Sequence, residues 1–138
     1  MQVAMIGCGY VGLVSAACFS EFGTQVACVD QDAKKIARLN EGLIPIYEPG
    51  LDELVRSNAR SGRLSFTTDL AGAVAAADAV FIAVGTPSRR GDGHADLAYV
   101  YAAATEIAAA LDGYTVVVAS PYGTADGAWH PDGNPFGS

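Results

Sequence analysis

Short apolar runs alternate along this chain with longer segments whose apolar residues recur at helical spacing. The runs predict five strands, at residues 2–6, 25–29, 64–67, 79–84 and 115–119. Runs that are apolar at nearly every position are typical of strands in a parallel sheet that is covered on both faces. We expect the shortest one, at 64–67, near an edge of the sheet.

Five helices are predicted between these strands, at residues 13–22, 33–40, from 51 to a stop at Gly62, 70–77 and 97–111. Asp69 and Asp96 are expected to cap the last two helices, because an aspartate oxygen accepts hydrogen bonds from a first helical turn. The alternation predicts an α/β fold of Rossmann type, a doubly wound parallel sheet with strand order 3-2-1-4-5. Its ligand is expected at the carboxyl ends of the strands.

A glycine pattern lies between the first strand and the first helix. Gly7, Gly9 and Gly12 stand in the spacing GxGxxG. In a nucleotide-binding βαβ unit the first glycine permits a tight turn, the second leaves room for a pyrophosphate, and the third lets the helix pack closely on the sheet. The free N–H groups and positive end of the following helix then favour phosphate binding.

An acid follows at the end of the second predicted strand. Asp30 lies 18 residues past Gly12, near the spacing at which a carboxylate hydrogen-bonds the adenosine ribose of a dinucleotide. A carboxylate there repels the additional phosphate of NADP, and Gln31 and Asp32 provide no arginine to accommodate it. The pattern favours NAD as the cofactor, and folds that bind other adenine nucleotides are the alternative.

The composition narrows the classes of partner. A formal net charge of −7 at pH 7 argues against binding to nucleic acid or to anionic membranes, which both attract basic surfaces. No stretch approaches the ~20 apolar residues of a membrane span. The chain begins almost directly in a predicted strand, so we expect no signal peptide. We therefore expect a cytoplasmic protein.

Three cysteines, Cys8, Cys18 and Cys28, show no metal-ligand spacing. We expect Cys18 and Cys28 in the core, as fits a reducing compartment. Cys8 is interpreted as a small residue between two glycines, although a helix N-terminus can lower a thiol pKa.

Four stretches together resemble the UDP-glucose/GDP-mannose dehydrogenase family. They are residues 5–14 around the glycine pattern, 40–51 with its Tyr-Glu-Pro-Gly-Leu core, Val-Gly-Thr-Pro at 84–87, and Asp-Gly-His-Ala-Asp-Leu at 92–97. The resemblance covers about residues 1–118. The stretch at 92–97 is closer to the UDP-glucose 6-dehydrogenase branch than to the GDP-mannose branch.

The resemblance implies an oxidoreductase that converts a sugar nucleotide's primary alcohol to a carboxylate with two NAD. In the family a cysteine captures the aldehyde, the thiohemiacetal is oxidised to a thioester, and water hydrolyses the thioester. Those catalytic groups lie downstream of the first domain, so no catalytic residue is assigned here. We expect this chain alone to bind NAD without turning over UDP-glucose.

The resemblance carries over a set of cofactor-binding residues: Gly7, Gly9, Tyr10, Val11, Gly12, Asp30, Lys35, Gly85 and Thr86. From position alone, Lys35 is equally a solvated lysine on a helix. For Thr86 the alternative is a simple strand terminator before Pro87.

Other polar residues receive plainer interpretations. Glu48, between Tyr47 and Pro49, is expected to orient its loop or a neighbouring domain rather than act as a general base. Arg89 and Arg90 are interpreted as solvated. Asp92, His94 and Asp96 are interpreted as a turn with a helix cap rather than a metal site.

The chain departs from the family pattern after Val118. Residues 120–138 hold three prolines and four glycines without apolar periodicity, which predicts an irregular tail after a dinucleotide-binding domain at 1–119. The domain's last strand, the family dimer helix, and the catalytic and sugar-nucleotide domains are expected to be absent. The alternatives are the GDP-mannose branch, a stand-alone NAD-binding regulatory module, and a poorly folding remnant.

Overall fold

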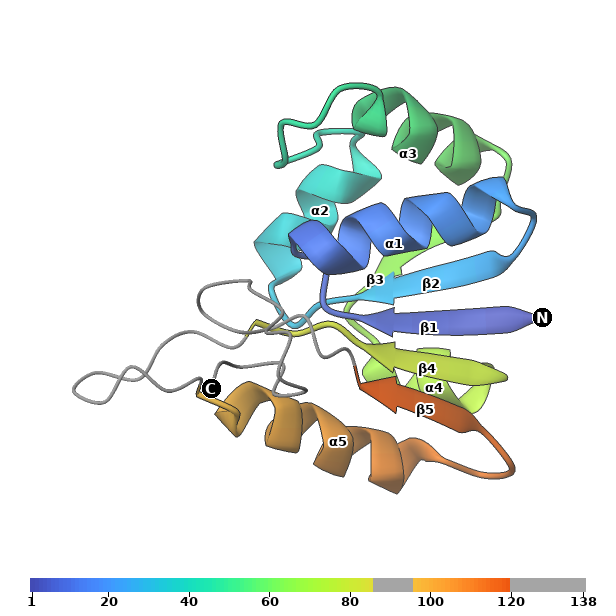
Figure 1. The fold of residues 1–138 in the computed structure, drawn as a ribbon, viewed down its shortest axis with the longest axis vertical. Coiled ribbons are helices and arrows are strands. Elements are labelled where there is room, and N and C mark those ends of the chain that lie inside the picture. Colours follow the sequence, from blue (N-terminus) through green and yellow to red (C-terminus); the bar gives the residue numbers. More distant parts are fainter. Residues whose placement is uncertain (86–95, 120–138) are drawn as a thin grey trace, which may run out of the picture.

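The computed structural model describes residues 1–85 and 96–119. Within them, five parallel strands form one sheet in the order β3-β2-β1-β4-β5 (Figure 1). The strands are β1 (Gln2–Ile6), β2 (Gln25–Val29), β3 (Leu64–Thr67), β4 (Ala79–Ile82) and β5 (Val116–Ala119). The strand order predicted from the sequence is confirmed, and β3 lies at an edge as expected.

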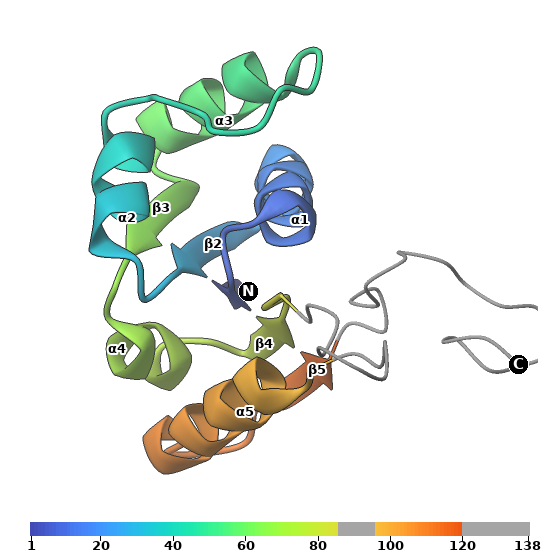
Figure 2. The same cartoon turned by 90° about the vertical axis from the view of Figure 1, so that its left-hand side faces the viewer.

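Helices cover both faces of this sheet. In the described residues they are α1 (Tyr10–Glu21), α2 (Ala33–Asn40), α3 (Leu51–Arg60), α4 (Leu70–Ala75) and α5 (Ala98–Ala110). Figure 2 shows α1, α2 and α3 on one side of the sheet and α4 and α5 on the other. The division follows from the strand order. The chain moves outward from β1 to β3 and then returns past β1 to β4, so right-handed crossovers place the two sets of helices on opposite faces.

Alternate residues of β1 belong to two separate cores. Val3 and Met5 lie in the cluster beneath α1, α2 and α3, whereas Ala4 and Ile6 lie in the cluster beneath α4 and α5. All four are nearly inaccessible to solvent. A strand buried on both faces has no solvent-facing positions for polar residues, which explains why its sequence is an apolar run rather than an alternation.

Several predicted element bounds differ from the structure by one to three residues, and two of these differences lie just after β1 and at the end of β4. The first helix begins at Tyr10 instead of residue 13, because Gly9 acts as its N-cap and Gly12 lies inside the helix. The fourth strand ends at Ile82 instead of residue 84. Its partner β1 ends at Ile6, and the chain turns away at Gly7, so the ladder has no further residues to pair.

The two predicted aspartate caps have different outcomes. Asp69 caps α4, since its Oδ1 accepts a hydrogen bond from the Gly72 N–H at 3.0 Å. For α5 the N-cap is Leu97, which makes no side-chain capping bond. Asp96 lies one residue earlier, and its Oδ1 accepts from the Ala98 N–H at 3.0 Å. The aspartate therefore closes a local turn just before the helix.

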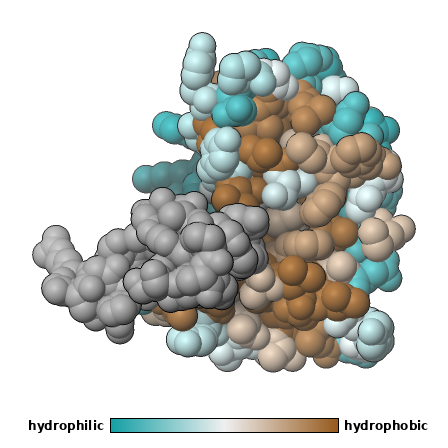
Figure 3. Space-filling view, viewed as in Figure 1, coloured by the Kyte–Doolittle hydropathy of each residue, from teal (hydrophilic) through white to brown (hydrophobic). Residues whose placement is uncertain are grey.

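The strand at the other edge, β5, is exposed. Its Val116, Val117 and Val118 remain 37–47 % accessible. Figure 3 shows hydrophobic residues gathered on the part of the surface where Figure 1 draws β5. An apolar edge strand of this kind is a surface onto which further chain can pack.

The structure also tests the expectations drawn from composition. No helix among the described residues is long and apolar enough to cross a membrane. Cys28 is buried as expected, but Cys18 is exposed. That prediction was wrong because α1 is apolar on nearly every side, so its sequence does not reveal which face meets the sheet.

Candidate functional site

A groove of about 710 Å³ opens at the carboxyl ends of the central strands. Its walls come from the β1–α1 turn, the end of β2, the start of α2, the residues after β4, and one face of α5. The position is the one expected for a doubly wound sheet, because β1 and β4 continue to helices on opposite faces and leave a crevice between them.

Gly7 and Gly12 shape this groove through close packing. Gly7 has a φ of +108°, and a Cβ added to it would lie 2.5 Å from the carbonyl oxygen of Ala83. A Cβ on Gly12 would overlap the carbonyl oxygen of Gly7. The predicted mechanical roles of these two glycines, a tight turn and close helix packing, therefore agree with the geometry.

Gly9 differs from both of them. It is exposed, lines the groove, and has ordinary extended dihedral angles (φ −78°, ψ −164°). A Cβ built on it would meet no protein atom within 4 Å. The space beside Gly9 thus belongs to the groove rather than to the protein core. It adjoins the first turn of α1, where the N–H groups of Tyr10 and Val11 lack helical partners and favour an anion.

Asp30 follows β2 at the edge of the groove. Its Oδ2 accepts from the Cys8 N–H at 3.1 Å, and its Oδ1 accepts from the Asp32 N–H at 2.9 Å. The side chain of Asp30 is only 12 % exposed. The carboxylate is therefore oriented by backbone donors from two different segments before any ligand is present.

These contacts set the charge state of Asp30. Burial by itself raises the pKa of the carboxyl, but the backbone N–H groups of Asp32 and Cys8 and the ammonium of Lys35 together outweigh burial. The pKa of Asp30 consequently lies below its ordinary value. The carboxylate is ionised at neutral pH and acts as a hydrogen-bond acceptor.

Lys35 forms an ion pair with Asp30. Its Nζ lies 3.2 Å from Oδ2 of that carboxylate, and the lysine side chain is 34 % exposed. Lys35 also lines the groove. It is therefore not a free solvated lysine, because it pairs with the acid that was predicted to bind the ribose. Its predicted contact with the cofactor stays a prediction.

Tyr10 connects the glycine turn to the segment before α3. Its hydroxyl donates to Oε2 of Glu48 at 3.2 Å. The negative charge of Glu48 and this hydrogen bond raise the pKa of Tyr10. The contact accords with a loop-orienting role for Glu48. Both side chains are exposed, so the link is one that solvent can exchange.

The structure brings together most of the predicted site residues. Those lining the groove are Gly7, Gly9, Tyr10, Val11, Asp30, Lys35 and Gly85. Gly12 lies behind the groove and acts through packing. Thr86 lies outside the described residues, as do Arg89, Arg90, Asp92, His94 and the predicted tail.

One wall of the groove was missed by sequence reasoning. Tyr99 and Glu106 on α5 face it, together with the small residues between them. The seven-residue spacing of Tyr99 and Glu106 places them two helical turns apart on one side of α5. That pattern was available, but without knowing which face of α5 meets the sheet it did not single out a site.

Comparison with known proteins places this geometry in a family. The family model described as "UDP-glucose/GDP-mannose dehydrogenase family, NAD binding domain" matches residues 1–128. The match extends ten residues beyond the 1–118 that the motifs indicated. A UDP-glucose 6-dehydrogenase of Rhizobium meliloti is 67 % identical over 129 residues, which is 91 % of this chain and 30 % of that protein.

Two solved structures show the same arrangement. A GDP-mannose dehydrogenase from Pseudomonas aeruginosa, solved as a ternary complex, superposes with a TM-score of 0.74 at 45 % identity, covering 78 % of this chain and 24 % of that one. A UDP-glucose dehydrogenase from Pyrobaculum islandicum superposes with a TM-score of 0.75 at 46 % identity, covering 79 % of this chain and 25 % of that one.

The chain thus spans between 24 % and 30 % of the length of these relatives. The match over 128 of 138 residues establishes that this chain belongs to the UDP-glucose/GDP-mannose dehydrogenase family and contains its NAD binding domain.

Proposed function

We propose that the groove residues described above are the ones that hold NAD, and that the whole protein oxidises UDP-glucose to UDP-glucuronate. The observation that carries the first part is the pairing of open space at Gly9 with a fixed, ionised Asp30. The second part is supported by the 67 % identity to a UDP-glucose 6-dehydrogenase.

The residues present suit a dinucleotide. The vacant Cβ position of Gly9 gives a diphosphate access to the backbone, and the first turn of α1 supplies N–H donors there. A groove of about 710 Å³ is within the range of small-molecule and cofactor sites, roughly 300–1,000 Å³. No arginine lies among the described residues that line it, which agrees with a preference for a ribose without a 2′-phosphate.

In this proposal the chain's own residues bind and orient. The N–H groups of Tyr10 and Val11 and the dipole of α1 hold the diphosphate. Asp30 accepts hydrogen bonds from ribose hydroxyls, while Lys35 and the Cys8 N–H keep the carboxylate in place. When bound, NAD accepts a hydride from the substrate. None of the described residues is assigned a catalytic step.

The substrate of the whole protein is proposed on relatedness. UDP-glucose is favoured over GDP-mannose because the identity to the Rhizobium meliloti enzyme exceeds the identity to the Pseudomonas aeruginosa GDP-mannose dehydrogenase. As the resemblance implies, the catalytic cysteine and the sugar-nucleotide site are expected in parts of the whole protein outside this domain. We also propose a cytoplasmic location, supported by three free cysteines.

A domain exchange tests the first part of the proposal, the binding of NAD by the groove. Residues 1–119 of this chain replace the equivalent residues of the Rhizobium meliloti enzyme, and NADH formation is followed at 340 nm with UDP-glucose or GDP-mannose. The chimera is expected to form NADH with UDP-glucose, and the chimera that also carries Asp30→Asn is expected to need more NAD. A chimera that folds and assembles like the parent enzyme but forms no NADH would refute the proposal.

A further inference from the structure

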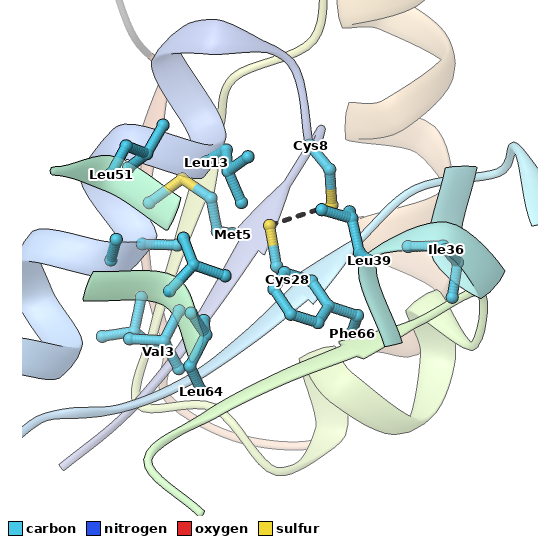
Figure 4. Close-up of a cluster of buried hydrophobic side chains, with 14 residues drawn as sticks. Val3, Met5, Cys8, Leu13, Cys28, Ile36, Leu39, Leu51, Leu64 and Phe66 are labelled. Atoms are coloured by element: carbon cyan, nitrogen blue, oxygen red, sulfur yellow. Dashed lines mark hydrogen bonds between the residues drawn. The ribbon is translucent and has the colours of Figure 1, made fainter. Parts of the chain in front are cut away.

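Two cysteine thiols lie against each other directly beneath the nucleotide-binding turn. Cys8 is 1 % exposed and Cys28 is 0 % exposed. Their Sγ atoms are 2.9 Å apart, and the Cys8 thiol donates to the Cys28 sulfur. Figure 4 shows the two sulfur atoms pointing toward each other within the cluster that contains Leu39 and Phe66.

Backbone contacts hold this pair in register. Cys28 lies on β2 opposite Met5 of β1, and Cys8 follows the turn at the end of β1. The Gly7 N–H donates to the Val29 carbonyl at 2.7 Å, which fixes the turn against β2. The proximity of the two sulfurs therefore follows from the parallel pairing of β1 and β2.

We propose that Cys8 and Cys28 are a redox-active pair that a small-molecule disulfide, such as oxidised glutathione, converts to an intramolecular disulfide. A disulfide bond is about 2.0 Å long, so the sulfurs, 2.9 Å apart, need to approach by about 0.9 Å. This modification site is independent of the function proposed above.

The chemistry balances in two exchanges. The thiolate of one cysteine attacks a sulfur of the oxidant, forming a mixed disulfide and releasing one small thiol. The thiolate of the other cysteine attacks the protein sulfur of that mixed disulfide and releases the second small thiol. The protein loses two electrons and two protons, and the oxidant gains them.

Burial makes the reaction depend on local opening. Neither sulfur is accessible, so the β1–α1 turn has to open before an oxidant enters. The hydrogen bond with Cys8 and burial raise the pKa of the Cys28 thiol well above its ordinary value, which further slows its attack. Cys18, exposed on α1, serves as an internal comparison for an accessible thiol.

Oxidation is coupled to the groove through Asp30. The Cys8 N–H donates to Oδ2 of that acid at 3.1 Å, and the Cys28 thiol contacts the Gly7 carbonyl at 4.0 Å. Drawing the sulfurs together shifts the turn that supplies both contacts. The predicted effect on NAD rests on the proposed role of Asp30, whereas disulfide formation does not.

The test uses the 138-residue chain with Cys18→Ala, which removes the thiol that is exposed in the folded chain. It is equilibrated in glutathione redox buffers, natively and in urea, and analysed by intact mass and peptide mapping. We expect a monomer that loses two hydrogen atoms, a linked Cys8–Cys28 peptide, full reversal by dithiothreitol, and a larger equilibrium constant in the native state than in urea. Cys8→Ala and Cys28→Ala variants, checked for folding by circular dichroism, are expected to lose the intramolecular product.

Three outcomes would refute the proposal that Cys8 and Cys28 form an intramolecular disulfide. They are glutathione adducts without a linked peptide, retention of both thiols under conditions that fully oxidise Cys18 of the unmodified chain, or an equilibrium constant in urea equal to or above the native one.

Calorimetric titration with NAD then tests the coupling. Oxidation is expected to weaken binding about tenfold, the order for disturbing one hydrogen bond to a charged group. Equal affinity of the two forms would refute the coupling. If neither form binds NAD, the proposed function fails while the mass result still decides the disulfide.

Discussion

Gly9 and Gly12 belong to one sequence pattern, but their substitution by alanine is predicted to affect different properties, ligand binding at Gly9 and stability at Gly12. A Cβ at Gly12 overlaps the Gly7 carbonyl oxygen, whereas a Cβ at Gly9 meets no protein atom within 4 Å. Alanine at position 12 should therefore damage the fold. Alanine at position 9 should damage only the binding of a ligand that enters the groove.

The magnitudes follow from the structure. In Gly12→Ala, overpacking against the fixed backbone lowers the free energy of unfolding by about 3 kcal/mol. The higher helix propensity of alanine raises it by about 1 kcal/mol. The net loss is about 2 kcal/mol. At Gly9 the dihedral angles suit alanine. Alanine is a slightly poorer N-cap than glycine, which lowers the free energy of unfolding a little, but it restricts the unfolded chain, which raises that free energy by about 0.4–1 kcal/mol. The two effects nearly cancel.

Urea unfolding followed by circular dichroism measures the first effect, and calorimetric titration with NAD measures the second. For Gly12→Ala the urea midpoint is expected to fall by about 1 M. For Gly9→Ala the midpoint should stay within about 0.5 M of the unchanged chain, while NAD affinity falls about tenfold or more. Equal loss of stability in both variants, or unchanged NAD affinity in Gly9→Ala, would refute this division of roles.

Three further predictions concern the charged groups of the groove. Because the pKa of Asp30 is lowered by folding, its ionised form stabilises the chain above about pH 4, and this contribution is lost as pH falls through the folded-state value. The difference in unfolding free energy between the unchanged chain and Asp30→Asn should thus shrink in acid, and a difference independent of pH would contradict the assignment. Lys35→Gln removes one of the contacts that lower this pKa, so carboxyl-carbon NMR should report a higher Asp30 pKa, and an unchanged titration would show that the ion pair is not formed in solution. Glu48→Gln should lower the pKa of Tyr10 toward its ordinary value, as followed by its ring-carbon NMR shifts, whereas an unaltered titration would exclude the contact between the two side chains.

The fold was predictable because its signals are local. Four of the five strands are apolar runs, most turns are marked by glycine or a capping aspartate, and the alternation of strands and helices leaves few topologies. The glycine spacing also predicted the turn at Gly7 and the packing at Gly12. Gly12 is constrained by Gly7, five residues earlier, whereas the backbone that an added Cβ at Gly7 would meet belongs to Ala83, after β4.

The parts that sequence reasoning missed depend on contacts distant in sequence. Lys35 is an exception, because it contacts Asp30, only five residues earlier, and this ion pair was not predicted. Its contact with the adenosine side of the cofactor stays a prediction. The exposure of Cys18 and the groove face of α5 depend on which side of an almost wholly apolar helix meets the sheet. The approach of Cys8 to Cys28 depends on strand register, which the sequence does not state.

Calorimetric titration of the 138-residue chain with NAD, in parallel with Asp30→Asn, tests the central claim most directly. We expect saturable binding by the unchanged chain, weakened about tenfold in the variant through loss of a charged hydrogen-bond acceptor, and weaker binding of NADP than of NAD. Absence of NAD binding by a chain that is folded by circular dichroism, or equal affinity of the two proteins, would contradict the account.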